Sequence, residues 1–74
     1  MVHDKPLAEN IKRIIRERGI KQYVVADRAD IPARDLSAML NGRKQILSVH
    51  VKLLSHALDT TPNELYGIEH THSA

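Results

Sequence analysis

The fold is decided by the stretch from residue 22 to residue 42, which reads QYVVADRADIPARDLSAMLNG. The apolar residues on each side of its centre recur at helical spacing. Pro32 disfavours helical geometry at Ile31, so the segment Asp30-Ile31-Pro32 is predicted to form a turn. We therefore predict one helix from about residue 22 to 29 and another from about residue 32 to 40.

The residues around this turn meet the requirements of two short helices that cross steeply. Ala26 is small enough to let the helices approach closely, and Asp30 tolerates the left-handed conformation of a tight turn, although less well than glycine does. Leu36 anchors the second helix, and Met39 and Leu40 complete its inward face at i+3 and i+4. This arrangement has the spacing of a helix-turn-helix.

Three more helices are predicted outside this pair, which makes the chain all-α. The first ends at Gly19, and its apolar face consists of Leu7, Ile11, Ile14 and Ile15. The next runs from about residue 48 to 58, with a main stripe of Val51, Leu54 and Leu58. A capping box with proline at the first helical position predicts a short last helix after Thr61-Pro62-Asn63-Glu64. We expect a five-helix domain over residues 1–68 and a polar tail over residues 69–74.

The composition is that of one small globular domain. The chain has 74 residues, of which 42% are hydrophobic and 27% charged. It has no cysteine, which excludes disulfides and thiolate metal sites. No apolar run reaches the roughly 18 residues of a membrane-spanning helix, and residues 1–6 lack the apolar stretch of a signal peptide. We expect a cytoplasmic protein that does not associate with membranes.

The charge is small overall but uneven along the chain. The formal net charge is +2. From residue 31 to 52 the basic residues are Arg34, Arg43, Lys44 and Lys52, against Asp35 as the single acid, whereas residues 53–74 hold three acids and no lysine or arginine. An anionic partner is expected to meet the middle of the chain. Taken alone, the pattern also fits a solvated surface with uneven charge.

The outward face of the helix predicted at 32–40 suits a DNA major groove. At 100° per residue, Arg34 and Ala38 lie opposite Leu36, Ser37 flanks them, and Ala33 lies near the N-terminal edge. Short side chains let the helix backbone enter a groove about 12 Å wide, where an arginine can donate two hydrogen bonds to guanine. The alternative is a plain amphipathic helix. The candidate base contacts on this face are Arg34, Ser37 and Ala38.

The order and spacing of these segments resemble the lambda-repressor/Cro-like helix-turn-helix family, from about residue 7 to residue 67. The resemblance implies a five-helix DNA-binding domain, usually used as a dimer on a near-palindromic operator. It matches Ala33, Arg34, Ser37 and Ala38 to the base-reading positions. It places Gln22, at the N-terminus of the second helix, at a phosphate contact. It places three further phosphate contacts at the end of the reading helix and in the following loop, at Asn41, Arg43 and Lys44. Tyr23 is a further phosphate candidate, with half-buried packing as the alternative.

The sequence also departs from the family pattern. Lys21 stands where serine or threonine usually caps the second helix, so that cap is expected to be weak and Lys21 to contact a phosphate. Asp30 replaces the common turn glycine. Ile15 and Leu40 replace an arginine and a glutamate that form an ion pair in many members, and we expect their side chains to touch.

We interpret the chain as a repressor-type, sequence-specific regulator that binds double-stranded DNA as a homodimer. Its dimer surface is expected near the last helix, at Leu65, Tyr66 and Ile68, although these residues also fit the core. The alternative is an antitoxin-like module that neutralises a protein partner and binds DNA secondarily. No histidine–carboxylate cluster has metal-ligand spacing and no catalytic constellation exists, so we expect no metal, no cofactor and no enzymatic activity.

Overall fold

The computed structural model describes residues 5–67, which form five helices: α1 (Lys5–Arg18), α2 (Gln22–Ala29), α3 (Ala33–Leu40), α4 (Ser48–Ala57) and α5 (Pro62–Tyr66). This confirms the predicted five-helix architecture. The bounds of α2 are those expected from the sequence. Helix α3 begins at Ala33 rather than at Pro32, because Pro32 takes the extended conformation of the residue before a helix, with a ψ of 137°. Residues 68–74, and with them Ile68 and the predicted tail, lie outside the described part of the chain.

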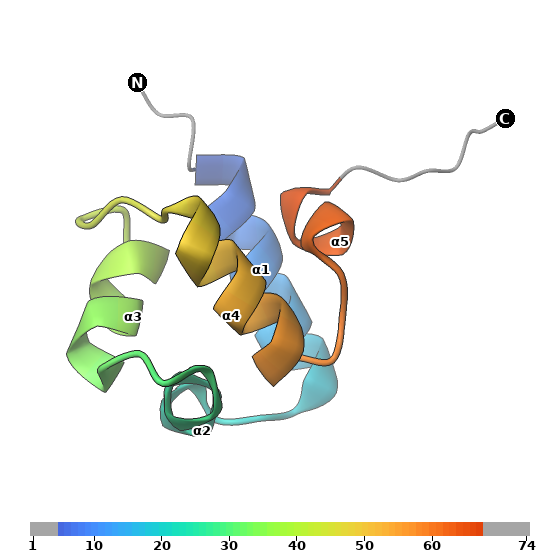
Figure 1. Cartoon of the computed structure of the whole chain (residues 1–74), viewed down its shortest axis with the longest axis horizontal. Helices are drawn as coiled ribbons and strands as arrows, with labels where there is room; N and C mark the ends of the chain where they lie inside the picture. Colours follow the sequence, from blue (N-terminus) through green and yellow to red (C-terminus); the bar gives the residue numbers. More distant parts are fainter. Residues whose placement is uncertain (1–4, 68–74) are drawn as a thin grey trace, which may run out of the picture.

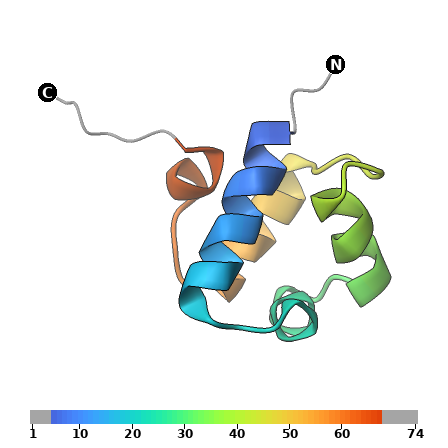
Figure 2. The same cartoon turned by 180° about the vertical axis from the view of Figure 1, so that it is seen from behind.

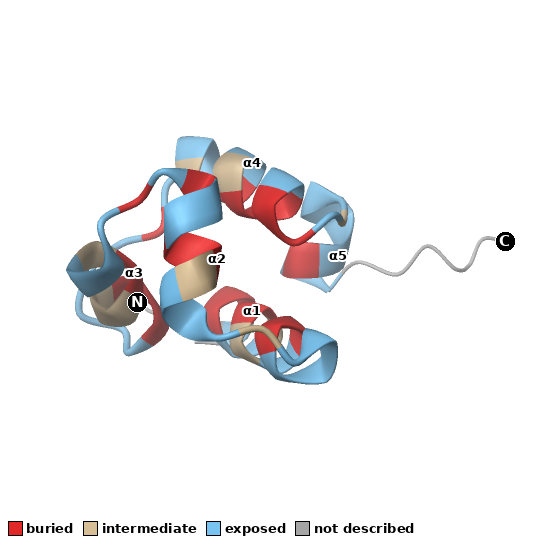
Figure 3. Cartoon of the chain, turned by 90° about the horizontal axis from the view of Figure 1, so that it is seen from below, coloured by how far each residue is buried: buried red, intermediate tan, exposed pale blue. Residues whose placement is uncertain are grey.

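Helices α1 and α4 lie on opposite sides of the core, and the other three helices connect them (Figure 3). Helix α1 packs against α3 and α5, and α2 packs against α3 and α4. Figures 1 and 2 show α3 and α5 at opposite ends of the domain in both views. The helix that is expected to read DNA therefore lies at one end, with its outer face turned away from the rest of the chain.

Every helix contributes a side chain to one shared core. The largest fully buried side chains are Ile11, Val25, Leu36, Met39, Leu54, Leu58 and Leu65. The buried positions follow the predicted apolar stripes, which shows that helical periodicity identified the inward faces correctly. Ile15 and Leu40 are both buried in this core, and their helices are in contact. A direct contact between those two side chains stays a prediction.

Four helices end in the same way, with a left-handed residue and a pair of backbone hydrogen bonds. After α1, the Gly19 N–H donates to Arg16 O and the Ile20 N–H to Ile15 O, which is a Schellman motif. The same two-bond pattern is centred on Asp30, Gly42 and Asp59, all of which have positive φ. The turn conformation predicted for Asp30 is confirmed by its φ of 59°. Asp59 also has a positive φ, of 55°, which the sequence analysis did not predict.

The N-termini of α4 and α5 are capped by side chains. The Leu47 N–H donates to His50 Nδ1 over 3.0 Å at the start of α4. At α5, Thr61 Oγ1 accepts from the Glu64 N–H, as the capping box predicts. The reciprocal bond differs from the prediction, because the Glu64 carboxylate accepts from the Thr60 hydroxyl instead of the Thr61 N–H.

Replacement of Asp30 by glycine is expected to stabilise the fold. A left-handed conformation costs a non-glycine residue about 1–2 kcal/mol, whereas the extra backbone entropy of an unfolded glycine costs about 0.5–1 kcal/mol. Asp30→Gly should therefore raise the free energy of unfolding by about 0.5–1 kcal/mol in urea denaturation. Asp30→Ala keeps the penalty and is the matched control. A glycine variant no more stable than the parent would show that the Asp30 side chain stabilises the turn.

Candidate nucleic-acid interface

The outer face of α3 presents the predicted base-reading residues to solvent. Ala33 and Arg34 are exposed, and Ser37 and Ala38 are half-buried on the same side. The opposite side of the helix is buried through Leu36, Met39 and Leu40. Within residues 5–67, neither Arg34 nor Asp35 belongs to an ion pair, so the Arg34 guanidinium keeps its donors for an external acceptor.

The loop after α3 is held against the end of that helix by its own backbone. The Ala38 carbonyl accepts from the Arg43 N–H over 2.8 Å and from the Lys44 N–H over 3.2 Å. Gly42 makes this return of the chain possible, because it takes a φ of 79°. Both basic side chains are exposed. The backbone therefore places two predicted phosphate contacts beside a predicted base contact, Ala38.

The last turn of α3 links two further predicted contacts. Asn41 Nδ2 donates to Ser37 Oγ over 3.4 Å, and the Asn41 N–H donates to Ser37 O over 3.0 Å. Asn41 is exposed and Ser37 is half-buried. An amide oriented by a neighbouring hydroxyl loses less rotamer freedom when it meets a phosphate, so this contact favours the predicted role of Asn41.

The N-terminus of α2 supplies the second group of predicted phosphate contacts. Lys21, Gln22 and Tyr23 are all exposed, and Tyr23 has 64% of its surface accessible. This exposure favours the phosphate role of Tyr23 over the packing role. Lys21 makes no side-chain cap, as expected, and its carbonyl accepts from the N–H groups of Val24 and Val25. The N–H groups of Gln22 and Tyr23 therefore receive no side-chain cap from Lys21, which suits an anion at this helix N-terminus.

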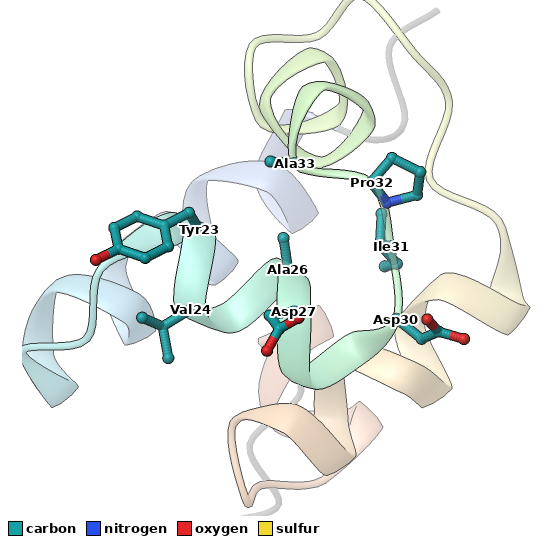
Figure 4. A pocket seen from close by; sticks show the side chains of 8 residues that line it. All are labelled: Tyr23, Val24, Ala26, Asp27, Asp30, Ile31, Pro32 and Ala33. Carbon is teal, nitrogen blue, oxygen red and sulfur yellow. The ribbon is translucent and has the colours of Figure 1, made fainter.

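A hollow of about 610 Å³ joins the N-terminal ends of α2 and α3. Its lining includes Tyr23 from α2, Ala33 from α3 and the turn between the helices (Figure 4). Ala26 lies in the hollow and points toward α3, which leaves room for the close approach of the helices. Two carboxylates, Asp27 and Asp30, also line it, so the hollow itself repels phosphate.

Comparison with known proteins assigns a family to this arrangement. Residues 10–70 match the Cro/C1-type HTH DNA-binding domain. The chain belongs to this family. It is a DNA-binding domain of a transcription regulator, and the lambda-repressor/Cro-like resemblance seen in the sequence is confirmed. Neither the curated proteins nor the solved structures contain a significant match to it.

One of the predicted dimer residues, Leu65, does not lie on the surface of this Cro/C1-type domain. Leu65 is fully buried, with 0% of its surface exposed, so its side chain completes the core and is not available to a partner. Its assignment to the dimer surface is therefore corrected. The reason is that α5 packs against both α1 and α4, and Leu65 belongs to the shared core. Tyr66 is 45% exposed, and Ile68 lies outside the described residues.

Metal-binding clusters and membrane-spanning helices are absent from the described part of the chain. No group of three or more histidine, aspartate or glutamate side chains in residues 5–67 could hold a metal ion. His70 and His72 lie beyond those residues. None of the helices formed by residues 5–67 is both long and apolar enough to cross a membrane.

Lys44→Ala is expected to weaken binding to every DNA sequence to a similar extent. A phosphate contact carries no base information, and its loss should reduce the slope of log affinity against log salt by about 1. The measurement is a fluorescence-anisotropy titration over several salt concentrations with two unrelated duplexes. Lys12→Ala, on α1, is the matched control because Lys12 carries no predicted DNA contact, and it should leave the slope unchanged. A Lys44 variant with the parental slope would remove this residue from the interface.

Proposed function

We propose that the chain is a sequence-specific, repressor-type transcription regulator that binds a near-palindromic operator as a dimer and reads the major groove with α3. The observation that carries this proposal is the position of Arg34. It is exposed on the outer face of α3, free of ion pairs within residues 5–67, and surrounded by the short side chains Ala33, Ser37 and Ala38.

In this proposal the N-terminus of α2 and the loop 41–44 contact phosphates, and α3 contacts bases. The N-terminus of α2 and the loop 41–44 hold phosphates on the two sides of the reading helix and so fix its depth and register in the groove. Arg34 then donates bidentately to guanine O6 and N7, and Ala38 meets a thymine methyl. Ser37, which already accepts from Asn41, can still donate its hydroxyl hydrogen to a base or phosphate acceptor.

Two copies are needed because one short helix reads few base pairs. Helix α3 has eight residues, and four of them are candidate base contacts. A second copy related by a two-fold axis places its α3 in the next major groove, about 34 Å away, and doubles the sequence that is read. Repression follows from occupancy, since a dimer on the operator excludes RNA polymerase from the same duplex.

Arg34→Ala is expected to reduce affinity for the preferred site by about 1–3 kcal/mol and to relax base preference at one position of each half-site. The measurement is a selection from randomised duplexes with the parent and the variant, followed by titration of the selected sequence. Arg16→Ala is the matched control, because Arg16 is exposed on α1 and carries no predicted contact. Equal affinity of the parent for all sequences at physiological salt would overturn the proposed function.

A further inference from the structure

The loop after α3 begins with the dipeptide Asn41-Gly42, and both of its residues are exposed. The side-chain amide of an asparagine can be attacked by the main-chain nitrogen of the next residue. The attack is least hindered when that residue is glycine, because glycine has no side chain and turns freely. A Cβ placed on Gly42 would meet no atom within 4 Å, so no other part of the described chain crowds this side of the loop.

Two long hydrogen bonds hold the dipeptide in place. The Gly42 N–H donates to Met39 O over 3.2 Å, and Asn41 Nδ2 donates to Ser37 Oγ over 3.4 Å. Both distances are at or beyond the upper end of the usual range for such bonds. Both bonds also belong to the end of a helix, where the backbone opens most readily. Opening of this single turn therefore releases the attacking nitrogen and the amide together.

The two residues after Gly42 favour the attack electrostatically. Arg43 and Lys44 are exposed, and neither belongs to an ion pair within residues 5–67. The Gly42 nitrogen must lose its proton before it attacks, and negative charge then develops on the amide oxygen of Asn41. Nearby positive charges stabilise both anions. The basic side chains of this loop therefore promote a reaction of its own asparagine.

We propose that Asn41 is a site of spontaneous deamidation, and that the product weakens the contact of this loop with DNA phosphate. The deprotonated Gly42 nitrogen forms a bond to Asn41 Cγ, the Cγ–Nδ2 bond breaks, and Nδ2 takes up a proton and leaves as ammonia. Water then opens the five-membered imide and returns a hydrogen to the Gly42 nitrogen. Hydrolysis at Cγ gives aspartate, and hydrolysis at the main-chain carbonyl carbon gives the β-linked isomer, isoaspartate.

Both products disturb the phosphate contact. An amide that can donate is replaced by a carboxylate, which only accepts and which repels phosphate. In isoaspartate the main chain also gains one atom between residues 41 and 42. The N–H groups of Arg43 and Lys44 then lose their register with the Ala38 carbonyl that accepts from them. This consequence rests on the proposed phosphate contacts of loop 41–44, whereas the chemical step does not.

Two further asparagines of the chain serve as internal controls. Asn10 is half-buried within α1 and precedes Ile11, whose branched side chain hinders attack. Asn63 precedes Glu64, whose N–H donates both to Thr61 O over 3.1 Å and to Thr61 Oγ1 over 3.2 Å. Both asparagines should therefore react more slowly than Asn41.

The first test is incubation of the full chain at physiological temperature, at neutral and at mildly alkaline pH, with peptide mass spectrometry at intervals. We expect Asn41 to deamidate about tenfold faster than Asn10 and Asn63, or faster still. The rate should rise with pH, because the attacking nitrogen must be deprotonated. Asn41→Gln is the matched variant, since it keeps an amide but would have to close a larger ring. The φ of −97° at this position admits glutamine, and circular dichroism checks the fold.

The second test is fluorescence anisotropy at low salt with a duplex of arbitrary sequence. The affinity of the incubated parent should fall in step with the deamidated fraction, whereas incubated Asn41→Gln should keep the affinity that it had at the start. Asn41→Asp should bind about tenfold more weakly than the parent, because it loses a hydrogen bond and adds repulsion. The inference is overturned if Asn41 reacts no faster than Asn10 and Asn63, or if its deamidation leaves the affinity unchanged.

Failure of the proposed function gives a different result. A randomised selection would then yield no preferred sequence, but neither the mass spectrum nor the affinity for an arbitrary duplex depends on sequence preference. The two tests therefore decide the inference in either case.

Discussion

The left-handed turn at Asp30 is the constraint on which the rest of the domain depends. It ends α2, returns the chain and lets α3 begin three residues later, at an angle that buries Leu36 and Met39. Once that face of α3 is inside, the geometry of the helix leaves its other face outside. The exposure of Arg34 is therefore a consequence of core packing, with no local interaction needed to hold it out. Ala26 supports the same arrangement, since a larger residue there would push α3 away from α2.

The proposed DNA surface combines a positioned backbone with basic side chains that form no ion pair within residues 5–67. The Ala38 carbonyl holds the loop backbone at Arg43 and Lys44, while the two side chains stay exposed. Elsewhere on the domain, the ion pairs Lys12–Glu9 and Arg13–Glu17 neutralise basic residues of α1 on an exposed helix surface. Exposed pairs of this kind contribute little to stability, so leaving the loop cations unpaired costs the fold little. The unpaired charge remains available for phosphate.

A domain of this size cannot bury all of its apolar residues. Small domains expose a larger fraction of their surface than large ones do, so some apolar side chains must remain accessible. Leu47, Val49, Tyr23 and Tyr66 are the exposed large apolar residues of the described chain. Tyr23 carries a hydroxyl suited to a wet interface, whereas Leu47 and Val49 have no polar group.

The sequence alone determined the five helices, the turn at Asp30 and the outward face of α3, because each depends on periodicity and backbone preferences within about ten residues. Helical periodicity also placed Arg34 on that outward face, whereas Gln22 and the basic loop were predicted as phosphate contacts from the family resemblance. Only the tertiary structure decided which of the remaining apolar residues are covered. Leu65 became core while Leu47 and Val49 stayed exposed. Burial depends on which helix packs over a residue, and periodicity within one helix does not contain that information.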